Sequence, residues 1–433
     1  MAPSARRPGG WPGQGPRPTL VSVHSVDVAV VGGGPGGAAA ATALARAGRE
    51  VVLIDKAVFP RDKCCGDGLT TGALRELELL GLDRRAVSSW QEIDSVWLRS
   101  PSGRTVEFPF PRGRGQFGAI ARRADLDLSL LDIARAAGAK IHEGQQLLAA
   151  SWSDAGVTLT VEGMQPLCAR YVIGADGMWS PLRKALHVDG DNEAYLGEWH
   201  AFRQYLARTG PLARQLWVWF EPDLLPGYAW SFPLPDGTAN VGFGVRRRPG
   251  EPTRSMASTW RSLLARPHIA AVLGADAEPE APHKAWPIPA RLSSTTVVGA
   301  GGRALFVGDA ARATDPMTGE GIGQALETAR LAAAAILRAG PGAPSVAARS
   351  YSRELATGMS IDHRLAGALS AALAHRKGVR AAVRIAGASD WTRRNFARWL
   401  FEDYPRAAAV TPWRWHRGLL SAAGAFLDDP VAP

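Results

Sequence analysis

Near its N-terminus the chain alternates short apolar runs with small residues in a pattern that predicts a β-α-β unit. Residues 26–31 (VDVAVV) fit a buried strand, and the glycine-rich segment 32–37 (GGGPGG) follows directly. Residues 38–47 are mostly alanine, the strongest helix former, and predict a helix. A second buried strand at residues 51–54 (VVLI) completes the unit, which spans about 30 residues.

Further along, the spacing of apolar residues predicts two kinds of sheet and a helical end. Residues 171–173 and 304–307 are apolar and lead into Gly/Asp turns, as expected for buried strands. Between residues 190 and 300 the strands become aromatic and punctuated by proline, as in 215–220 and 240–245. We expect these strands to form a sheet of a different type, which walls a pocket. After about residue 320 the chain is rich in Ala, Leu and Arg and is predicted to be mostly helical.

The composition supports a large folded protein and excludes several classes. The 433 residues suggest more than one domain, and 46% hydrophobic with 21% charged residues excludes overall disorder. Three cysteines, Cys64, Cys65 and Cys168, cannot form a disulfide framework, which favours a reducing, cytoplasmic compartment. Residues 1–20 lack an apolar run and no stretch of 18 apolar residues occurs, so we expect neither a secretory signal nor a spanning helix.

The net charge of +10 is concentrated at the two ends of the chain. Residues 1–20 carry +3 and residues 361–433 carry +5, which leaves only +2 for the rest. This distribution argues against a dedicated nucleic-acid-binding face, and we expect no nucleic-acid partner. The basic ends either meet an anionic surface or are solvated.

The glycine-rich segment has the spacing of a dinucleotide-binding fingerprint. Gly32 permits a tight turn after the strand, Gly34 lets the backbone approach a pyrophosphate, and Gly37 lets helix and strand pack closely. The helix N-terminus would then aim N–H groups at the phosphates. Asp55 stands at the end of the second strand, where its carboxylate can accept hydrogen bonds from ribose hydroxyls.

Two other strand-end turns favour FAD over NAD as the dinucleotide. Asp176 lies in Gly174-Ala175-Asp176-Gly177, and Asp309 lies in Gly308-Asp309-Ala310-Ala311. A carboxylate at a glycine turn can hold the polyol of a ribityl chain. The following glycine-rich stretch, 316–322, can aim N–H groups at the flavin edge where negative charge collects on reduction. Taken singly, each Asp-Gly turn is more often an ordinary turn.

In order and spacing, the three motifs resemble the flavoprotein superfamily of aromatic hydroxylases. The resemblance covers roughly residues 26–335. It implies that Asp55 meets the adenosine ribose, that Arg123 contacts FAD, and that the backbone of Leu147 lies near adenine. It also implies that Asp309 holds the ribityl chain and that residues 319–322 flank the isoalloxazine.

Two further segments resemble the geranylgeranyl reductases within that superfamily, and most of all the bacterial menaquinone-tail reductases. Residues 59–69 (FPRDKCCGDGL) are similar to the K-x-C-G signature, and residues 225–233 (LPGYAWSFP) to Y-x-W-x-F-P. The chain departs at Cys64, where proline is commoner. With the fingerprint, the likeness implies these cofactor-binding residues: Gly32, Gly34, Pro35, Gly36, Gly37, Asp55, Lys56, Lys63, Cys65, Gly66, Arg123, Leu147, Asp176, Gly308, Asp309, Pro316, Gly319, Gly321 and Ile322.

The resemblance implies a reductase that saturates C=C bonds of a prenyl chain, such as a geranylgeranyl or polyprenyl-quinone chain. The expected catalytic residues are Cys65, Tyr228 and Trp230. Cys65 is a possible proton donor, with a structural role as the equal alternative. Tyr228, Trp230 and Phe232 alternate along a strand and would line one face as a flat wall for an isoprenoid. We expect FAD, an external donor such as NAD(P)H or a small electron carrier, and no metal, since no histidines have metal-ligand spacing.

Two alternative functions remain open on the same fold. One is a FAD-dependent monooxygenase, hydroxylase or halogenase in natural-product tailoring. Residues 217–222 (WVWFEP) superficially match the W-x-W-x-I-P signature of flavin halogenases, but Glu221 stands where isoleucine belongs. The other alternative is a non-enzymatic flavin-binding module that is recruited to membranes.

The C-terminal segment has two compatible interpretations. Residues 361–417 hold eleven Lys and Arg against four acids, with tryptophans interleaved. Phe396, Trp399 and Leu400 fall at i, i+3 and i+4, which suits a helix lying on lipid headgroups. The segment could equally cap the substrate pocket. A cytoplasmic enzyme that is peripheral at the membrane would need both.

The predicted fold is α/β: a Rossmann-type FAD-binding domain, an interleaved antiparallel-sheet substrate domain and a helical C-terminal segment. The boundaries that we predict are these: a disordered tail at 1–25, the FAD-binding domain at 26–185 and 297–335, the substrate domain at 186–296 with a contribution from about 85–117, and the helical region at 336–433.

Overall fold

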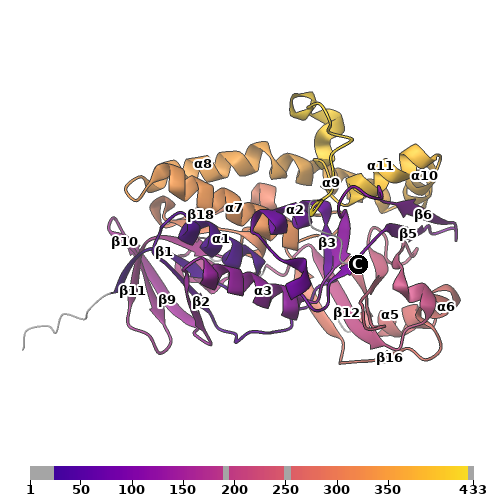
Figure 1. Ribbon diagram of the computed structural model, residues 1–433, viewed down its shortest axis with the longest axis horizontal. Coiled ribbons are helices and arrows are strands. Elements are labelled where there is room, and N and C mark those ends of the chain that lie inside the picture. The colour runs from indigo at the N-terminus through magenta and orange to yellow at the C-terminus, as the bar shows by residue number, and fades with distance from the viewer. Residues whose placement is uncertain (1–23, 189–194, 248–254, 428–433) are drawn as a thin grey trace, which may run out of the picture.

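The computed structural model describes residues 24–188, 195–247 and 255–427 (Figure 1). The predicted tail lies outside these ranges except for His24 and Ser25. Both residues belong to strand β1 (His24–Val31), because they pair with the start of β11 (Leu167–Gly174). The predicted tail boundary at residue 25 is therefore wrong by two residues.

The apolar runs of the sequence lie side by side in one eight-stranded sheet, here called the FAD-side sheet. β1 is central and pairs in parallel with β11 and with β2 (Val51–Asp55). Because β1, β11 and β19 run parallel, the turns that follow them meet at one edge of the sheet. The other strands are β8 (Lys140–Glu143), β9 (Leu147–Ser153), β10 (Gly156–Val161), β18 (Val298–Gly299) and β19 (Ala304–Phe306).

Helices cover the FAD-side sheet and share its hydrophobic core. α1 packs against both α3 and α7, and the alanines of its first half, residues 38–41, are buried. α1 begins at Pro35, three residues earlier than predicted, because the fixed φ of proline suits the first helical position. In Figure 1, α7 and α8 run alongside each other above the sheet. The bounds are α1 (Pro35–Arg46), α3 (Arg123–Ala136), α4 (Pro181–Ala185), α7 (Ile322–Ala339) and α8 (Pro344–Thr357).

A second eight-stranded sheet, here called the substrate-side sheet, contains the aromatic strands. Its pairs are antiparallel apart from β13 with β5, which are parallel. Strands β5 and β6 come from the contribution predicted at 85–117. The strands are β5 (Ser95–Arg99), β6 (Thr105–Pro109), β12 (Trp199–Ala207), β13 (Leu216–Trp219), β14 (Tyr228–Pro233), β15 (Ala239–Arg246), β16 (Glu278–Pro279) and β17 (Lys284–Ile288).

The remaining elements connect the two sheets or close the C-terminal side. A three-stranded sheet joins β3 (Gly68–Thr70), β7 (Gly118–Ile120) and β4 (Gln91–Glu92). α11 packs on β6, and Figure 1 shows α10 and α11 together at the end of the molecule beside β5 and β6. The helices are α2 (Thr71–Leu79), α5 (Ser255–Leu264), α6 (Pro267–Leu273), α9 (Met359–Leu373), α10 (Arg376–Ala386) and α11 (Asp390–Leu400).

None of the helices within the described ranges is both long and apolar enough to cross a membrane. The division of the chain into domains stays a prediction.

Candidate active site

A cavity of about 1010 Å³ lies where the two sheets and the C-terminal helices meet. The turns that follow β1, β11 and β19 line one part of it. The substrate-side sheet and helices α9, α10 and α11 line another. The cavity therefore joins the predicted dinucleotide site to a second, mostly apolar space.

The glycine loop after β1 has the shape that a pyrophosphate requires. A Cβ at Gly37 would lie 1.8 Å from the carbonyl oxygen of Gly32, so the helix and the turn can approach only without a side chain. Gly34, Pro35 and Gly36 line the cavity. A Cβ at Gly34 would meet only the ends of two arginine side chains, at 3.5 Å and beyond, so its backbone is open to a ligand.

Asp55 ties the second strand to this loop. Its carboxylate accepts hydrogen bonds from the backbone N–H of Gly33 at 2.6 Å and of Ala57 at 2.7 Å. Each carboxylate oxygen has a further lone pair, so Asp55 can still accept from a ribose hydroxyl. Lys56 and Leu147 line the same part of the cavity.

Two arginines approach Gly34 and share one buried carboxylate. Arg123 makes a bidentate pair with Asp127, at 2.8 and 2.7 Å. Arg61 reaches the same carboxylate at 3.2 Å. Asp127 is thus shared by the two guanidinium groups, and the Asp55 carboxylate also acts electrostatically on Arg61. Arg61 was not among the predicted cofactor-binding residues, although it lies in the segment 59–69 that resembles the K-x-C-G signature.

The turns after β11 and β19 each place an aspartate in the cavity wall. Asp176 accepts from the N–H of Leu182 at 2.8 Å, and its other oxygen is buried without a partner among the described residues. Burial raises the pKa of Asp176 to about 6. Asp309 pairs with Lys63 at 3.0 Å. Burial alone would raise the pKa of Asp309, but Lys63 lowers it below its usual value.

Residues 315–321, here called the Asp315 loop, follow the second of these turns. Gly319, Gly321 and Ile322 line the cavity together with Gly308, whereas Pro316 lies in the loop without lining it. Asp315 shapes the loop by accepting from the N–H groups of Met317 and Thr318, at 2.9 and 2.7 Å. The loop turns back because Gly319 has φ +74°.

Residues 62–68, here called the cysteine loop, are held by the substrate-side sheet. Asn240 donates to the carbonyl of Cys65 and to the carboxylate of Asp67, both at 2.8 Å. Tyr205 also donates to Asp67, at 2.5 Å. Gly66 lies against Phe232, where a Cβ would be 3.4 Å from the ring. Burial raises the pKa of Cys65.

The aromatic wall that the sequence predicts lies in β14 and borders the cavity. Tyr228, Trp230 and Phe232 follow one another with ring centroids 6.0 Å apart. The Tyr228 hydroxyl donates to the carbonyl of Thr318, and the Trp230 indole donates to Asn240 at 3.1 Å. The wall therefore contacts both the Asp315 loop and the residues that hold the cysteine loop.

The opposite side of the apolar space is formed by the C-terminal helices. Val379 and Val383 of α10 line it, with Phe396, Trp399 and Leu400 at α11. The i, i+3, i+4 stripe of α11 thus lines the cavity, and contact of the C-terminal segment with lipid headgroups stays a prediction. The interpretation of this segment as a cap fits the structure. The apolar lining that strands and C-terminal helices form together could not be predicted from the sequence, because these elements are far apart in the chain.

Within the halogenase-like stretch, Val218 and Phe220 line this space, whereas the two tryptophans do not. Trp217 and Trp219 pack in a separate hydrophobic cluster with Trp97 and helix α5. Glu221 is buried and bound to Arg266 and His268. These tryptophans therefore cannot border a substrate in this cavity. Within the described ranges, no group of three or more His, Cys, Asp or Glu side chains is placed to hold a metal ion.

Comparison with known proteins identifies the family. Residues 25–355 match the model of the FAD binding domain family. The chain is 36% identical over 361 residues to the menaquinone reductase of Mycolicibacterium smegmatis, covering 78% of this chain and 83% of the relative. It is 30% identical over 328 residues to digeranylgeranylglycerophospholipid reductase 1 of Methanopyrus kandleri, covering 71% and 79%. The chain belongs to this family of FAD-binding reductases.

Solved structures share the fold. A geranylgeranyl bacteriochlorophyll reductase-like protein from Thermoplasma acidophilum superposes with a TM-score of 0.73 at 21% identity, over 91% of this chain and all of that one. The halogenase PltM in complex with FAD superposes with a TM-score of 0.66 at 20% identity, over 83% and 79%. The predicted α/β fold is confirmed.

FAD is the cofactor of the family, and the residues present fit it. The glycine loop leaves its backbone open to phosphate, two arginines share one carboxylate beside it, and Asp176 has a buried oxygen that no described residue hydrogen-bonds. Each of these features is suited to a phosphate or a hydroxyl group.

Proposed function

We propose that this protein is a FAD-dependent reductase that saturates C=C bonds of a prenyl chain. The observation that carries the proposal is the apolar space that continues from the flavin loops between the substrate-side sheet and helices α9 to α11. An isoprenoid is long, flexible and without charge, and such a space buries it favourably. The names of the relatives, which refer to menaquinone and to geranylgeranyl lipids, support the same substrate class.

Reduced FAD supplies hydride in this chemistry. The residues of the chain carry out the other tasks. The aromatic wall and the helices align the chain and exclude water, which matters because an unactivated alkene is a poor hydride acceptor. The glycine loop, Arg61 and Arg123 would hold the pyrophosphate, and Asp309 would hold the ribityl chain.

Cys65 is the proton donor that we propose for the second alkene carbon. Burial raises the pKa of its thiol, so at neutral pH the group still carries its proton. It lines the cavity within the cysteine loop. One hydride and one proton then complete each saturated bond, and the thiolate regains a proton from solvent.

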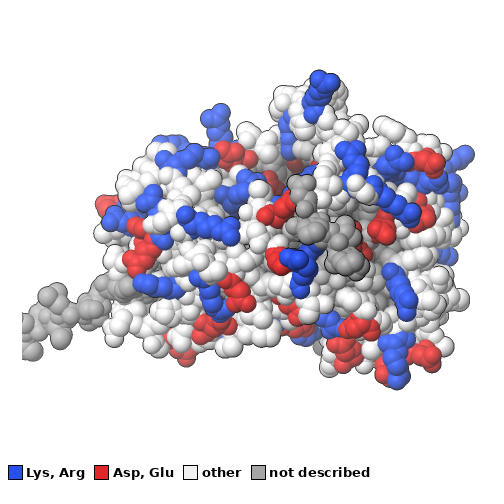
Figure 2. Space-filling model, in the orientation of Figure 1, with Lys and Arg blue, Asp and Glu red and all other residues white. Residues whose placement is uncertain are grey.

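A membrane surface and an external electron donor complete the proposal. α10 carries Arg376, Lys377, Arg380 and Arg384 without an acid, and none of them has an ion pair within the described ranges. Its other face, with Val379 and Val383, is buried. Figure 2 shows blue side chains over the end of the molecule where α10 and α11 lie. Such a helix can meet anionic lipids while it walls the substrate space.

The decisive experiment is anaerobic. Dithionite-reduced protein is mixed with geranylgeraniol or a polyprenyl quinone, and the product is examined by mass spectrometry. A gain of two hydrogen atoms per bond is expected. Reoxidation of the flavin without saturation would sink the proposal, and a gain of one oxygen atom in air would favour the monooxygenase alternative.

A matched pair of variants tests the apolar space itself. Ala382 lines the cavity, whereas its neighbour Ala381 on α10 is exposed. Ala382→Trp should raise KM for a long prenyl chain by about tenfold or more, since it fills space that the chain needs. Ala381→Trp should leave KM unchanged. Equal effects of both variants would contradict this location for the substrate.

Membrane contact has its own test. Arg380→Glu with Arg384→Glu should abolish flotation with vesicles of phosphatidylglycerol, because the charge reversal opposes the anionic surface. Reduction of substrate in detergent should persist. Unchanged flotation would contradict membrane contact through α10 and would mean that these arginines simply face solvent.

A further inference from the structure

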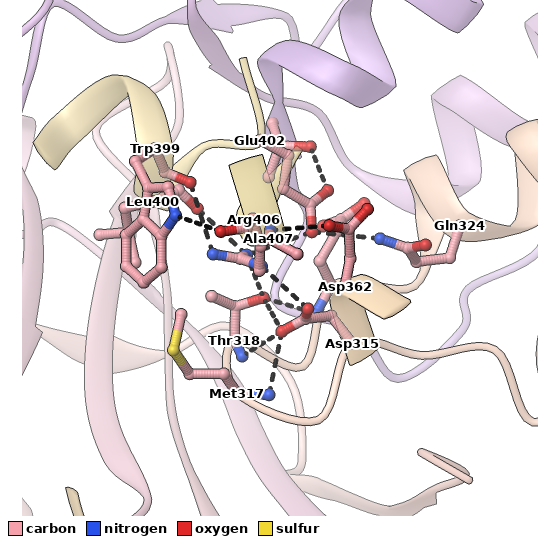
Figure 3. Close-up of polar contacts among 12 residues, drawn as sticks. Asp315, Met317, Thr318, Gln324, Asp362, Trp399, Leu400, Glu402, Arg406 and Ala407 are labelled. Carbon is pink, nitrogen blue, oxygen red and sulfur yellow. Dashed lines mark hydrogen bonds and ion pairs between the residues drawn. The ribbon is translucent and has the colours of Figure 1, made fainter. Parts of the chain in front are cut away.

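Arg406 is a buried arginine that touches both the flavin side and the substrate side of the cavity. It opens the short turn Arg406–Val410, and its side chain is only 2% exposed. Figure 3 shows its guanidinium among residues that are far apart in the chain, such as Asp315 and Trp399. The mechanism proposed above gives it no role.

On the flavin side, Arg406 holds the Asp315 loop. Its Nε donates to Asp315 at 2.9 Å, and one Nη donates to the Thr318 hydroxyl at 3.3 Å. Thr318 in turn donates its hydroxyl to Asp315 at 2.9 Å, so the three side chains form a closed set of hydrogen bonds. These hydrogen bonds hold the Asp315 loop in place. Tyr228 of the aromatic wall also holds it, because its hydroxyl donates to the carbonyl of Thr318.

On the substrate side, the same guanidinium holds the end of α11. It donates to the carbonyls of Trp399 and Leu400, at 3.4 and 3.3 Å, and lies 5.3 Å from the centre of the Trp399 ring. The Trp399 indole donates back to the carbonyl of Arg406 at 3.2 Å. Trp399 and Leu400 line the apolar space, so Arg406 bonds directly to the wall against which a prenyl chain would lie.

The hydrogen-bond acceptors around Arg406 suit a fixed guanidinium rather than a flexible cation. Asp315 and Glu402 both accept from it, the latter at 3.1 Å. The planar fork of arginine can serve several acceptors at once, which the single ammonium of lysine cannot do. Asp362 of α9 holds the next residue, Ala407, at 2.8 Å and so fixes the backbone from which Arg406 projects.

We propose that Arg406 is a positioning residue that sets the Asp315 loop against the flavin and couples that loop to the wall of the substrate space. The inference rests on the proposed function for its substrate half only, since FAD binding is established by the family. A prenyl chain that contacts Trp399 and Leu400 would then change the environment of the flavin through the side chain of Arg406. Misplacement of the loop by even about 1 Å would cost hydride transfer about 10- to 100-fold.

Arg406→Met, Arg406→Lys and Arg398→Met test this role. Arg398 is the matched control, because it is equally buried and ion-paired to Asp403, yet it bonds the carbonyls of Leu420 and Ala422 instead of the Asp315 loop. Three quantities are measured on the FAD-loaded proteins. They are the flavin midpoint potential, the change in the flavin visible spectrum on adding geranylgeraniol, and kcat with KM for prenyl reduction.

Arg406→Met should lower the midpoint potential, because the Asp315 carboxylate loses its counter-charge near the flavin. It should also remove most of the spectral response and lower kcat by about 10- to 100-fold, with KM changed less than about threefold. Arg406→Lys keeps the charge, so it should restore the potential but only part of the spectral response. Arg398→Met should match wild type in all three quantities, even if it melts earlier.

Equal potentials and spectra in Arg406→Met and Arg398→Met would overturn the proposal and make Arg406 a purely structural residue. If Arg406→Met fails to fold, Arg406→Lys against Arg398→Lys decides by the spectral response. A wild-type protein that reduces no prenyl substrate would refute the proposed function alone, because the midpoint potential still separates the two arginines.

Discussion

The cysteine loop and the Asp315 loop both border the flavin part of the cavity, but they are supported in different ways. The cysteine loop is held at many points: Asp62 pairs with Arg203 and Lys284, Cys65 bonds to Asn240, and Asp67 bonds to Tyr205. The Asp315 loop makes most of its own bonds through one carboxylate. Its main link to the rest of the chain is Arg406, supplemented by Tyr228.

This difference separates two structural roles. A loop with many anchors on the substrate-side sheet stays in place when one anchor is lost, as long as no polar group is left buried without a partner. A loop that depends on one distant guanidinium can respond to whatever moves that guanidinium. We therefore expect substitutions at the cysteine loop to affect stability, and substitutions at the Asp315 loop to affect stability, pH dependence and flavin properties together.

The largest expected effect is at Asp67. Asp67→Ala removes the acceptor of the buried Tyr205 hydroxyl and one of the two acceptors of the Asn240 amide, and it places alanine at φ +65°. We expect a loss of about 2–4 kcal/mol in the free energy of unfolding by urea. Asp67→Asn keeps an acceptor and tolerates the left-handed backbone, so it should lose less than half as much. Equal losses would show that the network adds little.

A smaller effect is expected on the pH dependence of stability, through Glu402, which accepts a hydrogen bond from Arg406 beside the Asp315 loop. Burial and the nearby Asp315 and Glu320 raise the pKa of Glu402 from an ordinary 4.5 to about 8, although Arg406 opposes the shift. Gln324 and Thr70 also face its carboxyl group, at 3.1 and 3.3 Å. The folded state therefore retains a proton that the unfolded state loses, and stability must fall as pH rises from about 4.5 to 8.

Glu402→Gln should flatten this fall by about 1–3 kcal/mol between pH 6 and pH 8, measured by urea unfolding at each pH. Asp67 provides the contrast. Burial raises the pKa of Asp67 to about 6, so Asp67 adds to the pH dependence of stability only up to about that pH. Glu402 still titrates above it. Asp67→Asn should change the slope only below about pH 6. A flattened slope above pH 6 in Asp67→Asn would contradict the separation of the two loops.

Thr318 gives a third, weaker test of the Asp315 loop. Thr318→Ala removes one hydroxyl that binds both Asp315 and Arg406, and should cost about 1 kcal/mol of stability. Thr318→Ser keeps the hydroxyl and should cost about half as much or less. Both variants should shift the flavin visible spectrum, and the shift should be larger in Thr318→Ala than in Thr318→Ser. Identical spectra in both would argue that the loop does not depend on this hydroxyl.

The smallest effect is expected at the exposed edge of the cysteine loop. Lys284 pairs with Asp62 at 2.5 Å, but the two side chains are 47% and 34% exposed. Lys284→Met should therefore change stability by less than about 0.5–1 kcal/mol, and the difference should shrink in 0.5–1 M salt. Arg203 remains bound to Asp62 and keeps the loop in place. A larger, salt-independent loss would mean that the loop depends on this single pair.

Local features of the fold followed from the sequence because they depend on residues close together in the chain. The β-α-β unit needs only a valine strand, a glycine turn and an alanine helix, and these appear within residues 24–55. The alternation of Tyr228, Trp230 and Phe232 placed them on one face for the same reason. The roles of the site residues stay predictions, although most of those residues line the cavity.

The partners of these local features were decided by tertiary structure. Asp315 and Arg406 are 91 positions apart, and nothing in either neighbourhood indicates that they meet. The stripe of α11 illustrates the limit: its apolar spacing is the same whether the helix faces lipid or a cavity. Packing on β6 and the burial of Arg406 place it against the cavity. Sequence alone determined the dinucleotide fold and its glycine loop, because backbone geometry is local. Only the tertiary structure decided how the substrate space is walled and coupled to the flavin side, because burial and charge pairing depend on residues far apart in the chain.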